Sequence, residues 1–268
     1  MSPGNCSEGT TAATLRVHRN IGYIEKRQRR TRWFVALGVV LLAIAVVTPL
    51  VDSAPNVIGI SYVALIIGFF AFIYGTQQYS KWRRRPRVDE LLDSALSKLS
   101  DRFALIHYPE IGRNAPEHVL VTPGGVVVLT VKDVGGRISV EGKRWRQHKI
   151  IFARFFNLGA PSLGNPTIES ELQMDRLEAL FDEHTVPGEI EGVVVFLSDD
   201  LEIQMKDPES TVAHISELFD LSREIAGEVQ LGNADRNAII ELLNVGTRFE
   251  STGARSSRPK KKIKVAGP

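Results

Sequence analysis

Residues 33–51 read WFVALGVVLLAIAVVTPLV and residues 57–75 read VIGISYVALIIGFFAFIYG, and these two apolar stretches decide the architecture of the chain. Each stretch holds about 19 uncharged residues, and a helix of that length spans roughly 30 Å, the thickness of the hydrocarbon core of a bilayer. Only residues 52–56 separate them, a short polar turn that contains Pro55, so the two helices must run antiparallel. The sequence therefore predicts a two-helix transmembrane hairpin over residues 33–75.

A pair of buried core helices or a signal peptide would fit these stretches less well. Helices in the core of a soluble protein usually carry a polar face, which neither stretch has. A cleaved signal peptide would begin nearer the first residue and would end in a small-residue cleavage site.

Basic residues flank the hairpin, and the turn between its helices has none. Five precede the first apolar stretch and five follow the second: Lys26, Arg27, Arg29, Arg30, Arg32, Lys81, Arg83, Arg84, Arg85 and Arg87. The positive-inside rule then predicts a multi-pass protein of the cell (inner) membrane with both termini in the cytoplasm. We expect the bilayer to be a partner of the chain, with four aromatic side chains at the headgroup level: Trp33, Tyr74, Tyr79 and Trp82.

The regions that flank the hairpin and the following domain are polar. Residues 1–20 lack apolar periodicity and are rich in Gly, Ser and Thr, so we expect a mobile start to a basic cytoplasmic arm over residues 1–32. Residues 251–268 end in RPKKKIKVAGP and predict a disordered basic tail, which is either solvated or meets anionic lipid or nucleic acid. The only cysteine, Cys6, excludes an intramolecular disulfide and a multi-cysteine metal site.

Residues 88–246 alternate between helical and strand patterns. Leucines at helical spacing predict an amphipathic helix over residues 88–100. Short runs rich in β-branched residues, separated by Gly-rich turns, predict five strands of one sheet: residues 103–107, 118–122, 126–132, 137–140 and 144–146.

The second half of this region predicts three helices and a buried strand. Asn165 and Pro166 are typical of the start of a helix, which should end near His184. The unbroken apolar run 193–197 predicts a central strand, and further helices are expected over residues 213–225 and 234–243, the last capped by Asn233. The whole indicates an α/β (α+β) domain with a mixed central sheet flanked by helices.

Three segments of this region resemble the nuclease-related domain (NERD) family in order and spacing. They read EHVLVTPGGVVVLTVKDVGGRISVEGKRWRQ (117–147), NPTIESELQ (165–173) and EGVVVFLSDDLEI (191–203), and the likeness covers residues 88–243. The resemblance implies the restriction-endonuclease-like fold, whose signature is an acidic residue that opens one strand and a Glu-x-Lys on the next. In an active member two carboxylates would hold Mg²⁺ or Mn²⁺, which activates a water for hydrolysis of a phosphodiester.

The resemblance places Glu117 on the first acid and Lys132 on the lysine of this signature, but Thr130 occupies the position of the glutamate. Strand alternation puts Thr130 and Lys132 on one face, although Thr130 cannot supply a carboxylate. Asp89 or Glu90, near a further acid of the family, remain as candidates. The resemblance thus implies a vestigial catalytic set of Glu117, Lys132 and Glu90, with Glu117 as a weak metal ligand or with no metal. The ordinary alternative is a surface ion pair between Glu117 and Lys132.

Two further positions bear on this site. Glu169 stands where the family often has Gln, and His118 is a frequent neighbour of the acid. Alternation directs His118 to the opposite face, which favours a role in core packing.

A basic turn with a tryptophan predicts contact with nucleic acid. Four residues there could bind phosphates and stack on a base, with His148 and Lys149 close by in the sequence: Lys143, Arg144, Trp145 and Arg146. The alternative is an ordinary solvated hairpin tip.

Three functions are consistent with these sequence features. The first is a membrane-anchored cytoplasmic NERD-domain protein that binds DNA, RNA or a protein partner and whose metal centre is degenerate, with no cofactor. The second is an active nuclease that depends on Mg²⁺ or Mn²⁺, and the third is a membrane scaffold without enzymatic activity. The oligomeric state is open in all three.

Overall fold

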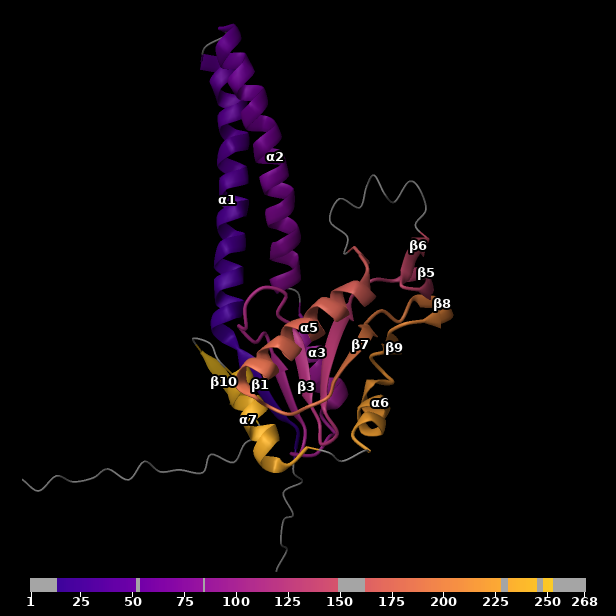
Figure 1. Ribbon diagram of the computed structural model, residues 1–268. Helices are drawn as coiled ribbons and strands as arrows, with labels where there is room; N and C mark the ends of the chain where they lie inside the picture. The colour runs from indigo at the N-terminus through magenta and orange to yellow at the C-terminus, as the bar shows by residue number, and fades with distance from the viewer. Residues whose placement is uncertain are drawn as a thin grey trace, which may run out of the picture.

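Two long apolar helices extend from an α/β domain as an antiparallel hairpin (Figure 1). The computed structural model describes residues 14–51, 54–83, 85–148, 162–227, 231–244 and 248–252. Helix α1 covers Ile21–Val51 and helix α2 covers Pro55–Arg83. Pro55 opens α2 instead of interrupting it, since the first amide of a helix needs no partner. The predicted pair of apolar helices is therefore present.

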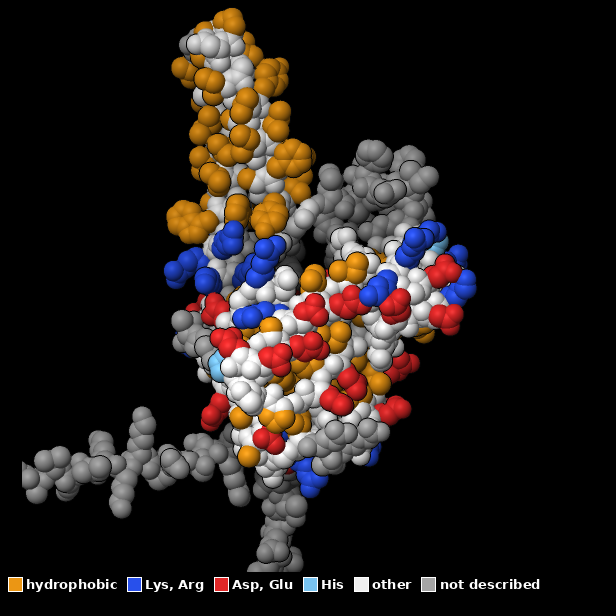
Figure 2. All heavy atoms as spheres, in the orientation of Figure 1, with side chains coloured by type: hydrophobic (Ala, Val, Ile, Leu, Met, Phe, Trp, Pro, Cys, Tyr) orange, Lys and Arg blue, Asp and Glu red, His pale blue; other side chains and the backbone are white. Residues whose placement is uncertain are grey.

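Both helices are long and apolar enough, by length and composition, to cross a membrane. Only 11% of the most apolar window of α1 and 17% of that of α2 is buried, so these are not core helices of the domain. Large side chains of the hairpin are exposed, such as Leu50 at 81% and Phe70 at 64%. Figure 2 shows hydrophobic side chains over the outside of the hairpin.

Small residues let the two helices approach closely. A Cβ on Gly38 would lie 2.6 Å from the backbone nitrogen of Phe72, and one on Gly75 would lie 2.8 Å from the backbone nitrogen of Val35. Near the far end the hydroxyls of Thr48 and Ser61 lie 2.7 Å apart, which joins the helices by a hydrogen bond.

The main sheet has seven strands in the order β10-β1-β2-β3-β4-β7-β9. The pairs β10–β1, β2–β3 and β3–β4 are antiparallel, whereas the pairs β1–β2, β4–β7 and β7–β9 are parallel. The bounds are β1 Arg16–Asn20, β2 Ala104–His107, β3 His118–Val121, β4 Val126–Lys132, β7 Ile190–Phe196, β9 Thr211–His214 and β10 Phe249–Thr252. The sheet is mixed, as predicted.

Helices cover both faces of this sheet. Helices α3 (Val88–Leu96) and α6 (Leu218–Ile225) share one apolar cluster with alternate strand residues such as Leu120 and Leu129. Helices α5 (Pro166–His184) and α7 (Asn233–Leu243) share the other cluster, with Val119 and Val128. Asn165 caps α5 as predicted, because its side-chain oxygen accepts from the amide of Ile168.

The first strand corrects the prediction of a mobile arm. Residues Arg16–Asn20 form β1, which lies between β10 and β2 in the sheet and runs directly into α1. Its partner β10 includes Ser251 and Thr252, so the first two residues of the predicted tail are also paired. The rest of the tail and residues 1–13 lie outside the described residues.

Three other predictions change. The segments predicted at 137–140 and 144–146 are β5 (Gly136–Gly142) and β6 (Arg144–His148), and they form a separate three-stranded sheet with β8 (Leu201–Pro208) instead of extending the main one. The predicted helix 213–225 divides into β9 and α6. Helix α7 takes Gly232 as its N-cap, and the Asn233 side chain accepts from Arg236 instead.

Candidate functional site

The end of β4 meets helix α5 at the position of the predicted catalytic signature. Thr130 Oγ1 donates a hydrogen bond to Gln173 Oε1 over 3.2 Å, and two residues further on Lys132 Nζ donates to Glu169 Oε2 over 2.5 Å. Thr130 and Lys132 thus face the same helix, as strand alternation predicted, and they meet residues one helical turn apart. Lys132 forms its ion pair with Glu169 and not with Glu117, the partner that an ordinary surface pair across neighbouring strands would use.

Glu117 lies beside this group, just before β3. The β3–β4 register pairs Val119 with Val128, and the same register extended by two residues would set Glu117 opposite Thr130. The carbonyl of Glu117 accepts from the amide of Tyr108. The first acid of the signature thus comes just before β3 and its lysine ends the neighbouring strand β4, with the Thr130 hydroxyl where the second acid would be.

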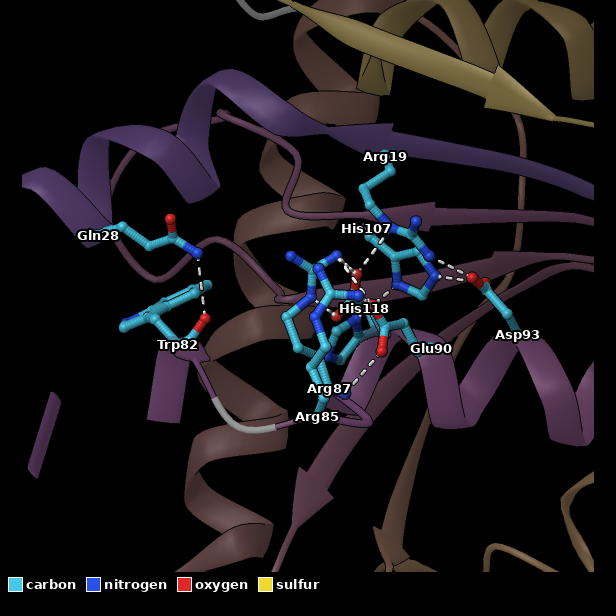
Figure 3. A network of polar contacts seen from close by, with 10 residues as sticks. Arg19, Gln28, Trp82, Arg85, Arg87, Glu90, Asp93, His107 and His118 are labelled. Atoms are coloured by element: carbon cyan, nitrogen blue, oxygen red, sulfur yellow. Dashed lines mark hydrogen bonds and ion pairs between the residues drawn. The ribbon is translucent and has the colours of Figure 1, made fainter. Parts of the chain in front are cut away.

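Asp89 and Glu90 are engaged elsewhere. Asp89 is fully buried and pairs with Arg19 at 2.7 Å and with Arg87 at 3.1 Å. Glu90 pairs with Arg85 at 3.2 Å and accepts from the backbone amide of Arg87 at 3.1 Å. Figure 3 shows these arginines gathered around the start of α3. Both acids neutralise guanidinium groups here, which lowers their value as metal ligands.

A second polar chain runs beneath α3. His107 Nε2 lies 2.9 Å from Asp93 Oδ1, and His107 Nδ1 lies 2.8 Å from His118 Nδ1 (Figure 3). Both histidines are buried, and Asp93 also pairs with Arg19. His118 is therefore buried, as alternation favoured, and it takes part in a hydrogen-bonded chain within the core.

Aromatic rings join the foot of the hairpin to the domain. Tyr23 of α1 stacks on Tyr108 with ring centroids 5.5 Å apart, and Trp82 of α2 lies 5.5 Å from Tyr108. Trp82 is only 5% exposed, so it packs against the domain, whereas Trp33 is 71% exposed. Burial raises the pKa of the Tyr108 hydroxyl, and the nearby Asp89 and Glu117 carboxylates raise it further.

The Thr130–Gln173 pair offers no charged ligand to a divalent metal. Mg²⁺ and Mn²⁺ prefer oxygen ligands that carry negative charge, and the Thr130–Gln173 pair is neutral. Across the described part of the chain, no group of three or more His, Cys, Asp or Glu side chains is arranged to hold a metal ion.

The predicted nucleic-acid contacts divide into two groups. Arg144 and Arg146 of β6 are exposed and point outward from the small sheet. Trp145 points inward, donates to Thr167 Oγ1 at 2.9 Å and packs on Phe196, so it is not available to stack on a base. Lys143 contacts Glu171 at 2.7 Å, and this hydrogen bond raises the pKa of Lys143. Lys149 lies outside the described residues.

Several residues of these networks were not identified from the sequence. Arg19, Asp93 and His107 come from three separate elements, and no local pattern connects them. The one usable signal was the spacing of Asp89 and Asp93, which places both carboxylates on one side of α3. Glu169 stood out in the sequence only as a departure from the family.

Comparison with known proteins supports the resemblance. Residues 73–197, just under half of the chain, match the model of the family described as nuclease-related domain. Neither the curated proteins nor the solved structures include a match to the chain. The matched segment runs from within the second half of α2 through β7 and so includes Glu117, Thr130, Lys132 and Glu169. The chain therefore contains a nuclease-related (NERD) domain, built on a mixed sheet with flanking helices and joined to two apolar helices of membrane-spanning length.

Proposed function

We propose that this chain is a membrane-anchored, nuclease-related protein that binds nucleic acid at the bilayer surface without hydrolysing it. The observation that carries the loss of hydrolysis is the hydrogen bond from Thr130 to Gln173. It places a neutral, buried pair where a metal-binding carboxylate would have to stand, and a phosphodiesterase of this type needs that carboxylate to hold its cation.

The exposed apolar surface of the hairpin supports the proposal that it anchors the protein in a membrane. Its apolar surface would be costly in water, at about 25 cal/mol per Å². Figure 2 shows Lys and Arg side chains between this apolar shaft and the domain. In our proposal the hairpin crosses the cell (inner) membrane, and the domain and both termini face the cytoplasm.

Labelling of the native cysteine tests this orientation. A membrane-impermeant maleimide should label Cys6 only after the inner membrane is opened. Labelling in intact spheroplasts would place the N-terminus outside and would contradict the proposed topology.

The outward face of the small sheet supports contact with nucleic acid. Arg144 and Arg146 lie two residues apart on the exposed side of β6, at a spacing of about 7 Å that is close to the separation of phosphates along a strand. Across the register, Glu141 faces Arg144, and Lys206 forms an ion pair with that carboxylate. Phosphate contacts by the two arginines make binding depend on salt.

The first experiment measures cleavage. The full chain in neutral detergent is incubated with single-stranded and duplex DNA and with RNA, in Mg²⁺ or in Mn²⁺. We expect intact substrates. Metal-dependent cleavage that Glu117→Ala and Lys132→Ala both abolish would replace our proposal with an active nuclease.

The second experiment measures binding against salt. The Arg144→Gln/Arg146→Gln variant should bind more weakly and should lower the slope of log K against log salt by about 2 units, about one for each arginine that no longer binds a phosphate. The matched control Lys98→Gln/Arg102→Gln removes the same charge from exposed positions elsewhere and should leave the slope unchanged. Negligible binding by the wild type at every salt concentration would favour the scaffold without nucleic-acid affinity.

One observation favours the active nuclease as a second candidate. Helix α5 brings the Glu169 carboxylate to Lys132, so an acid approaches the signature from a different element. With Glu117 opposite Thr130, two carboxylates flank this face, and Mg²⁺ often takes only one or two. In that case Glu169→Gln would abolish cleavage, whereas in our proposal it changes only the ion pair.

A further inference from the structure

A pocket lies at the foot of the hairpin, where both helices meet the segment that leads into α3. Its volume is about 340 Å³, near the lower end of the range of roughly 300–1,000 Å³ that is typical of small-ligand sites. Three arginines line it, one from α1 and two from the linking segment: Arg32, Arg85 and Arg87. Thr31 of α1 and the rings of Tyr79 and Trp82 of α2 complete most of the wall.

The position of this pocket along the hairpin matches the headgroup layer of a bilayer. Arg32 directly precedes the apolar span that begins at Trp33, and Tyr79 follows the end of the second span at Gly75 by four residues. At about 1.5 Å per residue, the wall from Arg32 to Tyr79 lies within roughly 6 Å of the edge of the hydrocarbon. Headgroups occupy a layer of about 5–8 Å on each side of the hydrocarbon core, so this wall lies at their depth.

The arginines differ in how far they are already neutralised. Arg87 makes a two-point contact with Asp89, at 3.1 Å for each hydrogen bond, and Arg85 contacts Glu90 at 3.2 Å with a side chain that is 78% exposed. Within the residues that the structure describes, no carboxylate lies within ion-pairing distance of Arg32. The pocket therefore holds positive charge that the nearby acids do not fully balance.

We propose that this pocket binds the phosphate group of an anionic phospholipid from the surrounding leaflet. Arg32 and Arg85 present planar guanidinium groups, which form paired hydrogen bonds to phosphate oxygens, and Tyr79 supplies ring surface at the level of the headgroups. The exposed apolar surface of α1 begins at Trp33, the residue after Arg32, and the acyl chains can pack against it. This inference rests on insertion of the hairpin in the membrane, and it is independent of whether the domain binds nucleic acid.

A bound lipid would also affect the joint between hairpin and domain. Gln28 of α1 donates to the carbonyl of Trp82 at 3.1 Å across the same foot, and Trp82 packs on Tyr108 of the domain. The ligand would therefore hold α1, α2 and the linking segment together at the point where the domain is attached. We expect it to stabilise the chain as well as to occupy the pocket.

The test titrates the full chain in neutral detergent, where no charged bilayer surface is present. The probes are short-chain phosphatidylglycerol, short-chain phosphatidylcholine, sn-glycerol 3-phosphate and inorganic phosphate, and native mass spectrometry counts the molecules retained by each chain. We expect one phosphatidylglycerol per chain at concentrations at which phosphatidylcholine is not retained. Arg32→Gln should weaken this binding about tenfold, which corresponds to a loss of roughly 1.4 kcal/mol.

A matched variant separates the pocket from the basic surface around it. Arg29 lies on the same helix, is exposed and does not line the pocket, so Arg29→Gln removes the same charge and should leave binding unchanged. Arg85→Gln should weaken binding as Arg32→Gln does. Equal losses in Arg29→Gln and Arg32→Gln would overturn the pocket in favour of a diffuse attraction, and equal retention of both lipids would also overturn it.

Two further outcomes identify the source of the phosphate and the cause of a failure. Displacement of phosphatidylglycerol by inorganic phosphate or sn-glycerol 3-phosphate at equal concentration would show that the pocket takes free phosphate and would overturn the lipid proposal. Flotation of the full chain with phosphatidylcholine vesicles checks insertion separately. A chain that floats but retains no anionic lipid overturns only the pocket, whereas a chain that does not float overturns the membrane anchor as well.

Discussion

Thr130 Oγ1 on β4 donates a hydrogen bond to Gln173 Oε1 on α5, and both side chains are buried. This contact lies at the position that decides whether the NERD domain of this chain can hold a metal ion. Because a neutral hydroxyl and a neutral amide satisfy each other there, the site is stable without a cation. A carboxylate at the same depth would need a cation or a proton to be stable.

Loss of the Thr130 hydroxyl should destabilise the domain without affecting its contacts with nucleic acid. Thr130→Val keeps the shape and leaves Gln173 Oε1 without this donor, at a cost of about 1–2 kcal/mol. For a domain of this size, we expect the unfolding temperature of the full chain in detergent to fall by roughly 2–8 °C. Thr211→Val, at an exposed position of β9, is the control and should change it little. An equal fall in both variants would mean that the hydrogen bond contributes nothing.

The buried Asp89 carboxylate should be essential to the joint between β1 and α3. The Asp89 carboxylate neutralises both Arg19 and Arg87. Asp89→Asn would therefore remove the negative charge that these two guanidinium groups share. Breaking a buried ion pair costs about 3–5 kcal/mol, and we expect the lower end because both arginines retain some contact with water.

Thermal unfolding of the full chain checks this cost. The variant Asp175→Asn makes the same chemical change at an exposed position of α5 and should be neutral. If Asp89→Asn unfolded at the wild-type temperature, the network in Figure 3 would not hold the domain to the hairpin.

The sequence predicted the elements whose signals are local. Each apolar span is a run of bilayer length, and the strands around residues 118–132 are rich in β-branched residues. The helix that starts at Pro166 is marked by its cap. Strand β1 was missed because its residues RVHRN alternate only weakly, and the strand exists through pairing with β2 and with β10, the second of which lies more than 200 residues later. Strand β8 is mostly exposed and shows no apolar run.

The candidate site shows the same division. Alternation along β4 was enough to place Thr130 and Lys132 on one face, because side chains on a strand alternate strictly. Their partners Gln173 and Glu169 lie about 40 residues further on, and only the packing of α5 on β4 brings them there. The orientation of Trp145 depended on which side of the small sheet packs on Phe196, which no local pattern reveals.

Close packing of the hairpin predicts different effects for two of its glycines. A Cβ on Gly38 would meet the backbone of Phe72 at 2.6 Å, so Gly38→Ala must push the helices apart, at a cost of about 1–3 kcal/mol. A Cβ on Gly59 would meet nothing within 4 Å, so Gly59→Ala is the matched control. We expect a lower unfolding temperature in neutral detergent for Gly38→Ala alone. Equal tolerance of both substitutions would show that the helices do not pack this closely.

Acid should weaken the hydrogen bonds that join β1 to β10 and to the residue that follows α7. The side chain of His18 lies 3.1 Å from Asn244 Nδ2 and 2.9 Å from Ser251 Oγ, both through Nδ1. The Asn244 amide can only donate there, so this contact requires that Nδ1 carry no proton. Burial lowers the pKa of His18 below its usual 6.5, and the positive charge of Arg16 lowers it further.

The direction of the pH effect follows from proton uptake. Between the lowered pKa and about 6.5 the unfolded chain binds a proton at His18 that the folded chain does not bind, so the free energy of unfolding falls as the pH falls through this window. Above about pH 6.5 His18 is neutral in both the folded and the unfolded chain, so its contribution to the free energy of unfolding no longer changes with pH. His18→Asn offers an acceptor that does not titrate, and it should flatten the dependence of the unfolding temperature on pH below 6.5. His148→Gln, at an exposed position of β6, should keep the wild-type dependence, and a wild-type slope in His18→Asn would show that other groups cause the acid sensitivity.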